Sequence, residues 1–596
     1  MRKFYLQYIS GLFLIFSVTI SAHEFTIIAT GDEKSPSAED CKRMGVSMLW
    51  FGSGLPQNGV PEKPEKIESI FKRFENSDIS IIPLMNAFYG KYPDKGQISR
   101  FSDKPAYRCF SQDNTDITER VASFTNWLSK FKNFKGLCGD DEPGIQPGGC
   151  VCKNCTELFK KEYGLNPPSN EDYQNATKGI VPENNSVLLW AKFQNDQIVK
   201  YYASIADSIK KEKPDARIMN IPAAAYYSGK QLSIPDCKPE NFVKSGRRVT
   251  LDNCHIRDFQ LYIQFYMNEI NSSGWKNKIA DGICLYMEKK GLPQFPNIPI
   301  YDKFDPNAKP VVISVPAFKR FIVQTFSEGG KGIVYFPGRS LSPEHVAAAE
   351  KVYNEFIKPV CKNTPLLHKM PGKVGILYST TTRTFSDLWI NNPIERYKHL
   401  HECDALAYYL FKKAIPFGII MEDEIKSPDD LKRFPVIISA GLDFISANKS
   451  KMLEEYIKDG GKLIVDKNSA VNIARAKVID FDAESWYRKV TEGTQTASNM
   501  EYQTRLLDKE LSLELKDLPV ICRTQDRRLN INYLTDGKDI YLFLVNDDLN
   551  TAAESILTFD KAYEVSDIIE NKNIAKTDKI KISVNPAELK VLKLEQ

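Results

Sequence analysis

The residues with the clearest chemical potential are three acids and three cysteines that lie close together. Asp140, Asp141 and Glu142 end an apolar run and are followed by Pro143-Gly144, which cannot continue a helix. This pattern predicts a buried strand whose carboxyl end opens into a loop of carboxylates. Because burial and neighbouring acids raise the pKa of a carboxyl group, Glu142 is a candidate proton donor. The alternative is a solvated acidic turn.

Cys150, Cys152 and Cys155 follow within a few residues, at the predicted start of a helix. Three thiols so close cannot all pair with one another, whereas Zn²⁺ takes four thiolates in a tetrahedron. Cys109 is the favoured fourth ligand, because it lies in a loop and Cys138 lies inside a strand. The spacing predicts a structural zinc site that braces the loop after the acidic strand. The alternative is one disulfide and a free thiol.

The elements that must position these residues alternate between strand and helix over residues 23–365. A TIM (β/α)8 barrel fits this pattern, since active-site groups of that fold follow the carboxyl ends of its strands. A doubly wound sheet is the competing fold, but its Gly-rich loop after the first strand is absent. One strand is left open, either between Val249 and Tyr266 or at Val311–Val315. The other predicted strands are Phe25–Ala29, Ser47–Phe51, Ile79–Leu84, Phe134–Cys138, Arg217–Ile221, Gly282–Met287 and Gly332–Phe336.

Two smaller domains are predicted after the barrel. Residues 366–490 alternate apolar strands with helices, as in a flavodoxin-like or amidotransferase-like α/β domain. The predicted turn after strand Pro435–Ser439 carries no cysteine, so an amidotransferase nucleophile is absent and the domain is predicted to be structural. Residues 491–596 show period-2 patterning with Asp-Gly and Asn-Asp turns, which predicts a small β-sandwich.

The net charge and the N-terminal segment indicate which partners and which compartment to expect. The 596 residues have a net charge of +4 with both signs interspersed, so no nucleic-acid partner is expected. Residues 1–22 have a basic start, an apolar core and small residues near Ala22, which predicts a signal peptide. No other segment is apolar enough to span a membrane. A secreted or periplasmic protein is therefore expected.

The acidic strand end and the Cys-x-Cys-x-x-Cys stretch together resemble glycoside hydrolase family 42, the β-galactosidases of clan A. In that family the acid after Asn is the general acid/base, which corresponds to Glu142. The family nucleophile ends a Leu-Met-Glu strand, and Leu285-Tyr-Met-Glu288 is similar. The family also has a cysteine zinc site with one upstream cysteine, to which Cys109 is similar. The strand Tyr335-Phe336 with Arg339 matches a family strand and arginine.

This resemblance implies a retaining hydrolase of β-linked carbohydrates. Glu288 would attack the anomeric carbon, and Glu142 would protonate the leaving oxygen and then activate water. The resemblance also implies a trimerisation role for residues 366–490. Candidate sugar contacts are the polar and aromatic residues at or near predicted strand ends: Asp141, Trp50, Asn86, Tyr286 and Arg339.

Two departures from the family pattern keep another function open. Asp141 stands where the family has Asn, and no Trp follows Glu288 within the segment Gly291–Phe295. The alternative function is a non-catalytic glycan-binding protein on a barrel whose catalytic pair has decayed.

Overall fold

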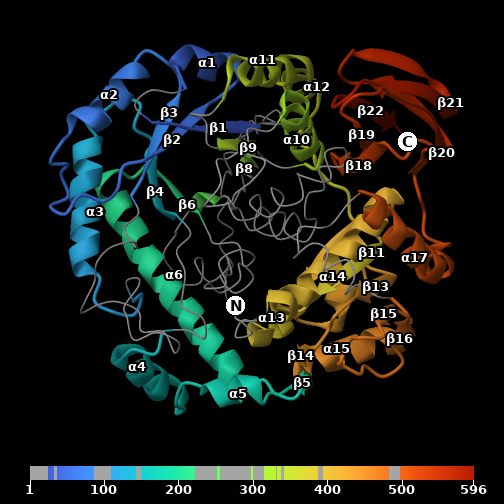
Figure 1. Cartoon of the computed structure of the whole chain (residues 1–596), viewed down its shortest axis with the longest axis horizontal. Helices are drawn as coiled ribbons and strands as arrows, with labels where there is room; N and C mark the ends of the chain where they lie inside the picture. Colours follow the sequence, from blue (N-terminus) through green and yellow to red (C-terminus); the bar gives the residue numbers. More distant parts are fainter. Residues whose placement is uncertain are drawn as a thin grey trace, which may run out of the picture.

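The computed structural model describes residues 25–32, 36–85, 109–141, 150–221, 251–254, 297–299, 314–329, 332–336, 341–386, 393–481 and 497–595. Within these residues the chain forms a parallel barrel sheet, a smaller parallel sheet with helices, and a C-terminal antiparallel sheet (Figure 1). No helix among the described residues is long and apolar enough to cross a membrane.

The N-terminal sheet has eight described strands, and neighbouring strands run parallel. Its first and last strands, β1 and β9, are hydrogen-bonded to each other, with Ile28 opposite Val334. From β1 the order continues through β2, β3, β4, β6 and β7, while β8 lies beyond β9. Such a cyclic order is that of a barrel, because a doubly wound sheet reverses direction after its first strand. The strands are β1 (Thr26–Thr30), β2 (Met48–Gly52), β3 (Ser80–Leu84), β4 (Gly136–Asp141), β6 (Arg217–Ile221), β7 (Leu251–Cys254), β8 (Asn297–Pro299) and β9 (Gly332–Phe336).

Alternating residues of these strands face two different cores. Ile28, Ile82 and Val334 share a small interior cluster, whereas their neighbours Ile27 and Ile81 pack under the surrounding helices. The helices lie outside the strands in Figure 1. They are α1 (Ala38–Arg43), α2 (Glu65–Arg73), α3 (Thr115–Leu128), α6 (Ser186–Glu212), α10 (Val315–Ser327), α11 (Pro343–Val352), the π-helical turn η3 (Tyr353–Ile357) and α12 (Lys358–Asn363).

The predicted barrel strands agree with the structure except between residues 249 and 315. The strand left open is β7, within the range 249–266. In the other alternative, Val311–Val315, Val315 begins α10 and the Ser314 side chain caps that helix, while residues 311–313 lie outside the described residues. β8 was not predicted, since three residues that include Pro299 give no strand signal. The predicted strand Gly282–Met287 lies outside the described residues.

The second domain is a five-stranded parallel sheet with the order β12-β11-β13-β15-β16. In chain order this is 2-1-3-4-5, the flavodoxin-like arrangement, as predicted. Short β16 was missed, because its three residues leave Val478 exposed and give no apolar run. The elements are β11 (Val374–Tyr378), α13 (Thr380–Ser386), α14 (Pro393–Lys412), β12 (Phe417–Met421), η4 (Glu422–Glu424), η5 (Pro428–Leu431), β13 (Val436–Ser439), β14 (Phe444–Ser446), α15 (Ala447–Lys458), β15 (Lys462–Asp466) and β16 (Lys477–Ile479).

In the C-terminal domain seven strands join in one hydrogen-bonded sheet, and the predicted division into two stacked layers stays a prediction. The long strands β20 and β21 shift register between Thr558 and Tyr563, and side chains from both sides of the shift share one core with β18, β19 and β22. The helix α17 was also missed, since its sequence was read with the strands that follow. The elements are β10 (His368–Lys369), α17 (Ala497–Leu515), β17 (Cys522–Arg523), β18 (Leu529–Thr535), β19 (Ile540–Asn546), β20 (Ala553–Asp567), β21 (Lys572–Val584) and β22 (Leu589–Glu595).

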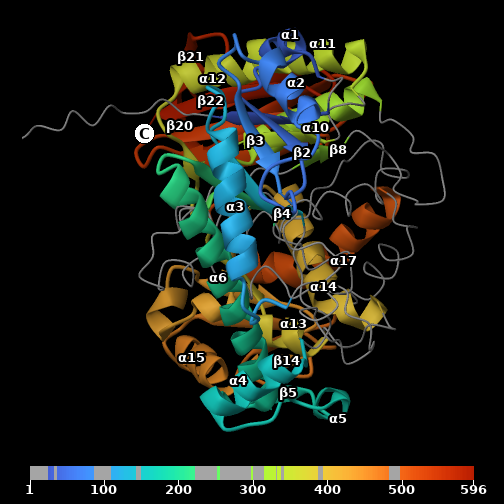
Figure 2. The ribbon, with the colours of Figure 1, turned by 90° about the vertical axis from the view of Figure 1, so that its left-hand side faces the viewer.

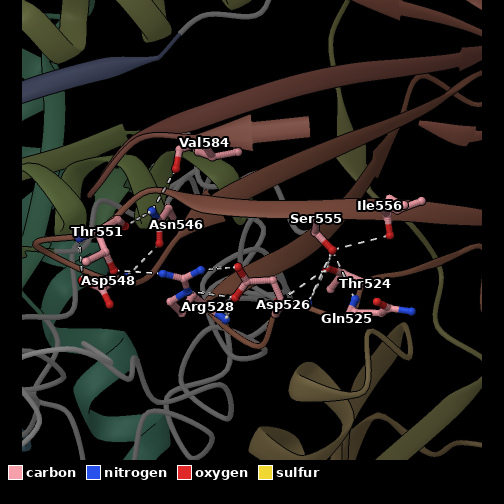
Figure 3. A network of polar contacts seen from close by, with 10 residues as sticks. All are labelled: Thr524, Gln525, Asp526, Arg528, Asn546, Asp548, Thr551, Ser555, Ile556 and Val584. Atoms are coloured by element: carbon pink, nitrogen blue, oxygen red, sulfur yellow. Dashed lines mark hydrogen bonds and ion pairs between the residues drawn. The ribbon is translucent and has the colours of Figure 1, made fainter. Parts of the chain in front are cut away.

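One end of this sheet is closed by side-chain hydrogen bonds (Figure 3). Arg528 donates hydrogen bonds to both carboxylate oxygens of Asp526, at 2.9 and 2.6 Å, and to Thr551 Oγ1 at 2.9 Å. The Asn546 amide donates to the carbonyls of Thr551 and Val584, at 2.8 and 2.9 Å. These contacts tie the β19–β20 turn to both neighbouring strands, which fixes the register there.

Residues 150–185, which we call the arm, lie between β4 and α6 and extend away from the barrel. The arm contains α4 (Lys153–Tyr163), α5 (Asn170–Gln174) and β5 (Gly179–Val181). Its strand β5 pairs in parallel with β14 of the flavodoxin-like domain. Both views show α4, α5, β5 and β14 gathered at the end of the molecule opposite the barrel (Figures 1 and 2).

Candidate functional site

The barrel strand β4 runs through the first part of the predicted acidic site. It begins at Gly136 and ends at Asp141, so Asp140 and Asp141 belong to its carboxyl-terminal end. The strand therefore continues beyond the predicted Cys138. Its register shifts between Cys138 and Asp141 where it pairs with β6. Such irregularities occur at barrel rims and next to active sites.

Trp50, on β2, is one of the predicted sugar contacts, and the structure describes its side chain. Its side chain is 4% exposed and packs in the interior cluster with Ile28, Ile82 and Val334. It lies opposite Thr30 on β1 and Ile82 on β3. Trp50 thus forms part of the packed barrel interior, and its contact with a sugar stays a prediction. The remaining predicted residues of the carbohydrate site, Glu142, Glu288, Asn86, Tyr286 and Arg339, lie outside the described residues.

The four predicted metal ligands come together as one buried cluster, which we call the four-cysteine centre. The sulfur atoms of Cys109, Cys150, Cys152 and Cys155 all lie within 4.8 Å of one another. Cys109 Sγ lies 3.6 Å from Cys150 Sγ, 3.6 Å from Cys152 Sγ and 3.4 Å from Cys155 Sγ. A zinc ion with four Zn–S bonds of about 2.3 Å would separate its sulfurs by about 3.8 Å. The donor set and its spacing therefore fit a tetrahedral metal ion.

The same geometry argues against the disulfide alternative. A disulfide bond brings two sulfurs to about 2.05 Å, and all four cysteines are free thiols here. Cys138, the rejected fifth candidate, is fully buried in the barrel interior cluster and is not part of the centre. The sequence-based choice of Cys109 over Cys138 is thus confirmed.

Three separate segments build the centre. Cys109 precedes α3, and Cys150 opens the arm. Cys152 is the N-cap of α4 and Cys155 lies in its first turn. Helix α4 ends at Gly164, whose left-handed φ of 69° suits a glycine C-cap. Helix α6 supplies the third side through Trp190 and Phe193, whose rings pack on Phe159 with centroids 4.8 and 5.5 Å away.

The four thiols differ in how readily they lose a proton. Hydrogen bonds among them lower the pKa of Cys109 and Cys152 and raise the pKa of Cys150 and Cys155. Cys152 also lies at the amino end of α4, where the helix dipole favours negative charge. Thiolates are the form of cysteine that binds metals. Cys152 is therefore the thiol that its surroundings favour most as a thiolate.

Polar groups around the thiols were not found from the sequence. Ser111 Oγ lies 2.7 Å from Cys155 Sγ and 3.1 Å from Cys109 Sγ. Asn154 donates to the Ser111 carbonyl, which joins α4 to the Cys109 loop. Buried Gln194 of α6 accepts from the Cys150 backbone N–H at 3.2 Å. Their proximity to cysteine in the sequence was the only signal for Ser111 and Asn154, and Gln194 had none.

The flavodoxin-like domain contains a tight turn where an amidotransferase would carry its nucleophile. Gly441 has a φ of 62°, and a side chain there would collide with the Glu402 carboxylate. The nearest thiol, Cys403, is fully buried, and burial raises its pKa above the ordinary value. It lies 3.7 Å from His399 Nδ1. A buried, protonated thiol is a poor nucleophile, which agrees with a structural role for this domain.

Comparisons with known proteins identify the fold of the whole chain. No protein-family model matches the sequence, and no curated protein is significantly similar to it. The structure is similar to a β-galactosidase from Bacillus circulans sp. alkalophilus, with a TM-score of 0.65, 11% identity, and 96% of this chain and 99% of that chain covered. A catalytic mutant of a GH42 β-galactosidase from G. stearothermophilus gives a TM-score of 0.64 at 13% identity, with 96% and 99% covered.

Other similar structures carry different activities in their names. An α-L-fucosidase isoenzyme from Paenibacillus thiaminolyticus gives a TM-score of 0.62 at 10% identity, with 96% of this chain and all of that chain (100%) covered. The chain thus shares the three-part fold of GH42 β-galactosidases over nearly its whole length, as the sequence resemblance implied. At these identities the likeness describes the fold.

Proposed function

We propose that the chain is a retaining glycoside hydrolase that acts on β-linked oligo- or polysaccharides, with Glu142 as general acid/base and Glu288 as nucleophile. The observation that supports this best is the course of β4. This strand ends at Asp141, so the segment that begins with Glu142 follows the carboxyl end of a barrel strand. Enzymes with this fold have their active sites at that edge. The similarity to glycosidases over nearly the whole chain supports the same reaction class.

The sugar that the proposed enzyme acts on needs its own argument. The similar structures named above include β-galactosidases and an α-L-fucosidase, so one fold serves sugars of different stereochemistry. We propose a β-galactoside as the first substrate to test, from the family resemblance. Asp141 would then accept a hydrogen bond from a sugar hydroxyl where the family has an amide.

The proposal is tested with a panel of aryl glycosides that includes the β-galactoside and the α-L-fucoside. Glu142→Gln and Glu288→Gln should each lower kcat by at least about 100-fold, since a missing acid/base alone costs about 10²–10⁴. Azide should restore turnover of Glu288→Ala by replacing the nucleophile. Glu212→Gln, at the end of α6, is the control and should keep wild-type activity.

The second candidate is a non-catalytic glycan-binding protein, which the replacement of the family Asn by Asp141 favours. In that case the wild-type protein would turn over no member of the panel and would still bind a glycan. Full activity of both glutamine variants would contradict the assignment of the catalytic pair.

We further propose that the four-cysteine centre holds a structural Zn²⁺ ion. Cys109, Cys150, Cys152 and Cys155 would be its ligands. Thiolate donors at these separations suit zinc, and no position is left open for a reacting water. The ion would hold the start of the arm against the Cys109 loop.

Export and assembly complete the proposed function. The signal-peptide pattern of residues 1–22 supports a secreted or periplasmic protein, and N-terminal sequencing of the mature chain should begin near Ala22 or His23. We propose a homotrimer from the family resemblance, which sedimentation equilibrium would test. The domain limits 23–365, 366–490 and 491–596 need one refinement: β10 pairs with β18 of the C-terminal sheet.

A further inference from the structure

The arm links the four-cysteine centre to the flavodoxin-like domain. At one end, Cys150, Cys152 and Cys155 belong to the centre. At the other end, β5 pairs with β14 in the register Gly179 to Phe444, Ile180 to Ile445 and Val181 to Ser446. We call the β5–β14 pair the clasp. It connects the barrel chain to a domain that begins about 200 residues later.

Specific contacts hold the clasp together. The Gly179 N–H donates to the Asp443 carbonyl at 2.8 Å. Lys178 Nζ lies 2.9 Å from the Asp443 carboxylate, which is 3% exposed. Glu183 accepts from the Asn448 N–H at 3.0 Å, in the first turn of α15. Below the strands, Val181 shares an apolar cluster with Tyr173, Phe385 and Phe444.

The β14 side of the clasp is fixed by its own domain. The Ser379 and Thr382 hydroxyls both donate to the Phe444 carbonyl, at 2.8 and 2.6 Å. The Phe444 N–H donates to Thr382 Oγ1 at 2.9 Å, and the Ser446 N–H donates to the buried Glu422 carboxylate at 2.9 Å. β14 therefore offers a rigid edge to which β5 docks.

The β5 side is a three-residue strand, which cannot hold its position alone. Both chain paths that lead to it pass the four-cysteine centre. On one side α4 begins with Cys152 and Cys155. On the other side the first turns of α6 place Leu189, Trp190 and Phe193 against the same cysteines. The centre is thus the anchor from which β5 is held against β14.

We propose that metal in the four-cysteine centre controls the clasp: with zinc bound, the arm is held against the flavodoxin-like domain, and without it β5 separates from β14. The physical reason is the connection that the ion makes. Sulfur atoms of the Cys109 loop and of the arm lie 3.4–3.6 Å apart and would all bond to one ion, whereas without it only weak thiol contacts join the two segments. This inference rests on the proposed zinc binding and is independent of the proposed glycosidase activity.

Hydrogen exchange of the full-length protein tests the inference. Zinc is removed with a chelator under reducing conditions and then restored, and the zinc content of every sample is measured. We expect amide exchange in peptides covering 176–188 and 441–449 to become at least about tenfold faster without zinc and to recover with it. Peptides of β18 and β19 should not change, which separates clasp opening from global unfolding. Unchanged exchange at the clasp in zinc-free protein would overturn the proposal, as would a protein that binds no zinc.

Two variants and one control substitution show whether the centre controls the clasp or the clasp controls the centre. Cys155→Ser should reproduce the zinc-free pattern in untreated protein, whereas Cys41→Ser, which removes a buried thiol under the barrel helices, should not. Gly179→Pro removes the N–H that bonds to Asp443 and should open the clasp while zinc content stays at the wild-type level. If Gly179→Pro releases zinc as readily as Cys155→Ser, the clasp controls the centre and the proposed direction is wrong. The aryl glycoside assay is run in parallel, so failure of this inference is distinct from loss of the proposed activity.

Discussion

At the residue scale, the most distinctive group of side chains is the four-cysteine centre. Its four buried cysteines come from two distant segments, and their sulfur atoms are spaced as the ligands of a tetrahedral ion would be. The polar groups around them either contact sulfur directly, as Ser111 does, or fix the backbone, as buried Gln194 does. A thiol cluster supported in this way is expected to bind metal tightly, because the surrounding polar contacts orient its ligands.

The prediction at this scale concerns metal content. Purified wild-type protein should contain about one zinc ion per chain, and Cys152→Ser should lose most of it, because three thiolates leave the tetrahedron incomplete. Elemental analysis of both proteins measures this, together with thiol titration. Cys41→Ser is the matched control and should keep its zinc. Oxidised thiols with only traces of metal would instead support the disulfide alternative.

At the element scale, the flavodoxin-like domain depends on polar contacts at the carboxyl ends of its strands. His399 of α14 is buried, accepts the Ser379 N–H at Nε2 at 2.7 Å and lies 2.7 Å from the Ala440 carbonyl through Nδ1. An imidazole that accepts at one nitrogen and donates at the other is neutral. His399 thereby joins the ends of β11 and β13 only in its neutral form.

This histidine gives the domain an expected pH dependence. Burial lowers the pKa of His399 to about 4, against about 6.5 in an unfolded chain. The unfolded state therefore takes up the proton first, and stability present above about pH 6.5 is lost as the pH falls toward 4, by about 3 kcal/mol in total. Thermal unfolding of wild type and His399→Gln at pH 7 and 4.5 measures this loss of stability. The variant should be less stable at pH 7 and change less with pH, while exposed His368→Gln should behave as wild type.

At the scale of the whole molecule, the three domains meet at one buried carboxylate. Lys412 Nζ of the flavodoxin-like domain lies 3.3 Å from Asp547 Oδ2, and Arg320 of the barrel helix α10 lies 4.0 Å from Asp547 Oδ1. Arg320 NH1 also donates to the Asp547 carbonyl at 3.3 Å. Arg320 is 1% exposed, and its burial lowers its pKa. The negative charge of Asp547 thus lies close to two positive charges, one from each of the other two domains.

Removal of this carboxylate should destabilise the assembly of domains. Asp547→Ala removes a negative charge that faces buried Arg320, and breaking such a buried pair costs about 3–5 kcal/mol. The measurement is the shift of the thermal or urea unfolding midpoint. Asp578→Asn, an exposed acid on β21, is the control and should change stability by no more than about 0.5 kcal/mol. Equal effects of the two substitutions would show that Asp547 does not join the domains.

Local patterns in the sequence were enough to predict the apolar strands of the first two domains and the cysteines that cluster. Strands β1 to β4, β11 to β13 and β15 are apolar runs bounded by polar turns, so the barrel order and the flavodoxin-like domain could be predicted from them. The cysteine spacing likewise identified the thiols that cluster, because three of the four lie within six residues. Short β8, β14 and β16, and α17 at the start of the C-terminal domain, were missed because tertiary packing rather than local pattern selects them.

Only the tertiary structure showed which distant segments touch. The pairing of Gly179 with Phe444, the clamp of Gln194 on Cys150 and the position of Asp547 between two domains each join residues tens to hundreds of positions apart. A sequence pattern reports on neighbours along the chain, whereas these contacts depend on how whole elements pack. The pairing order of the C-terminal strands has the same cause, because period-2 strands do not specify which strands pair.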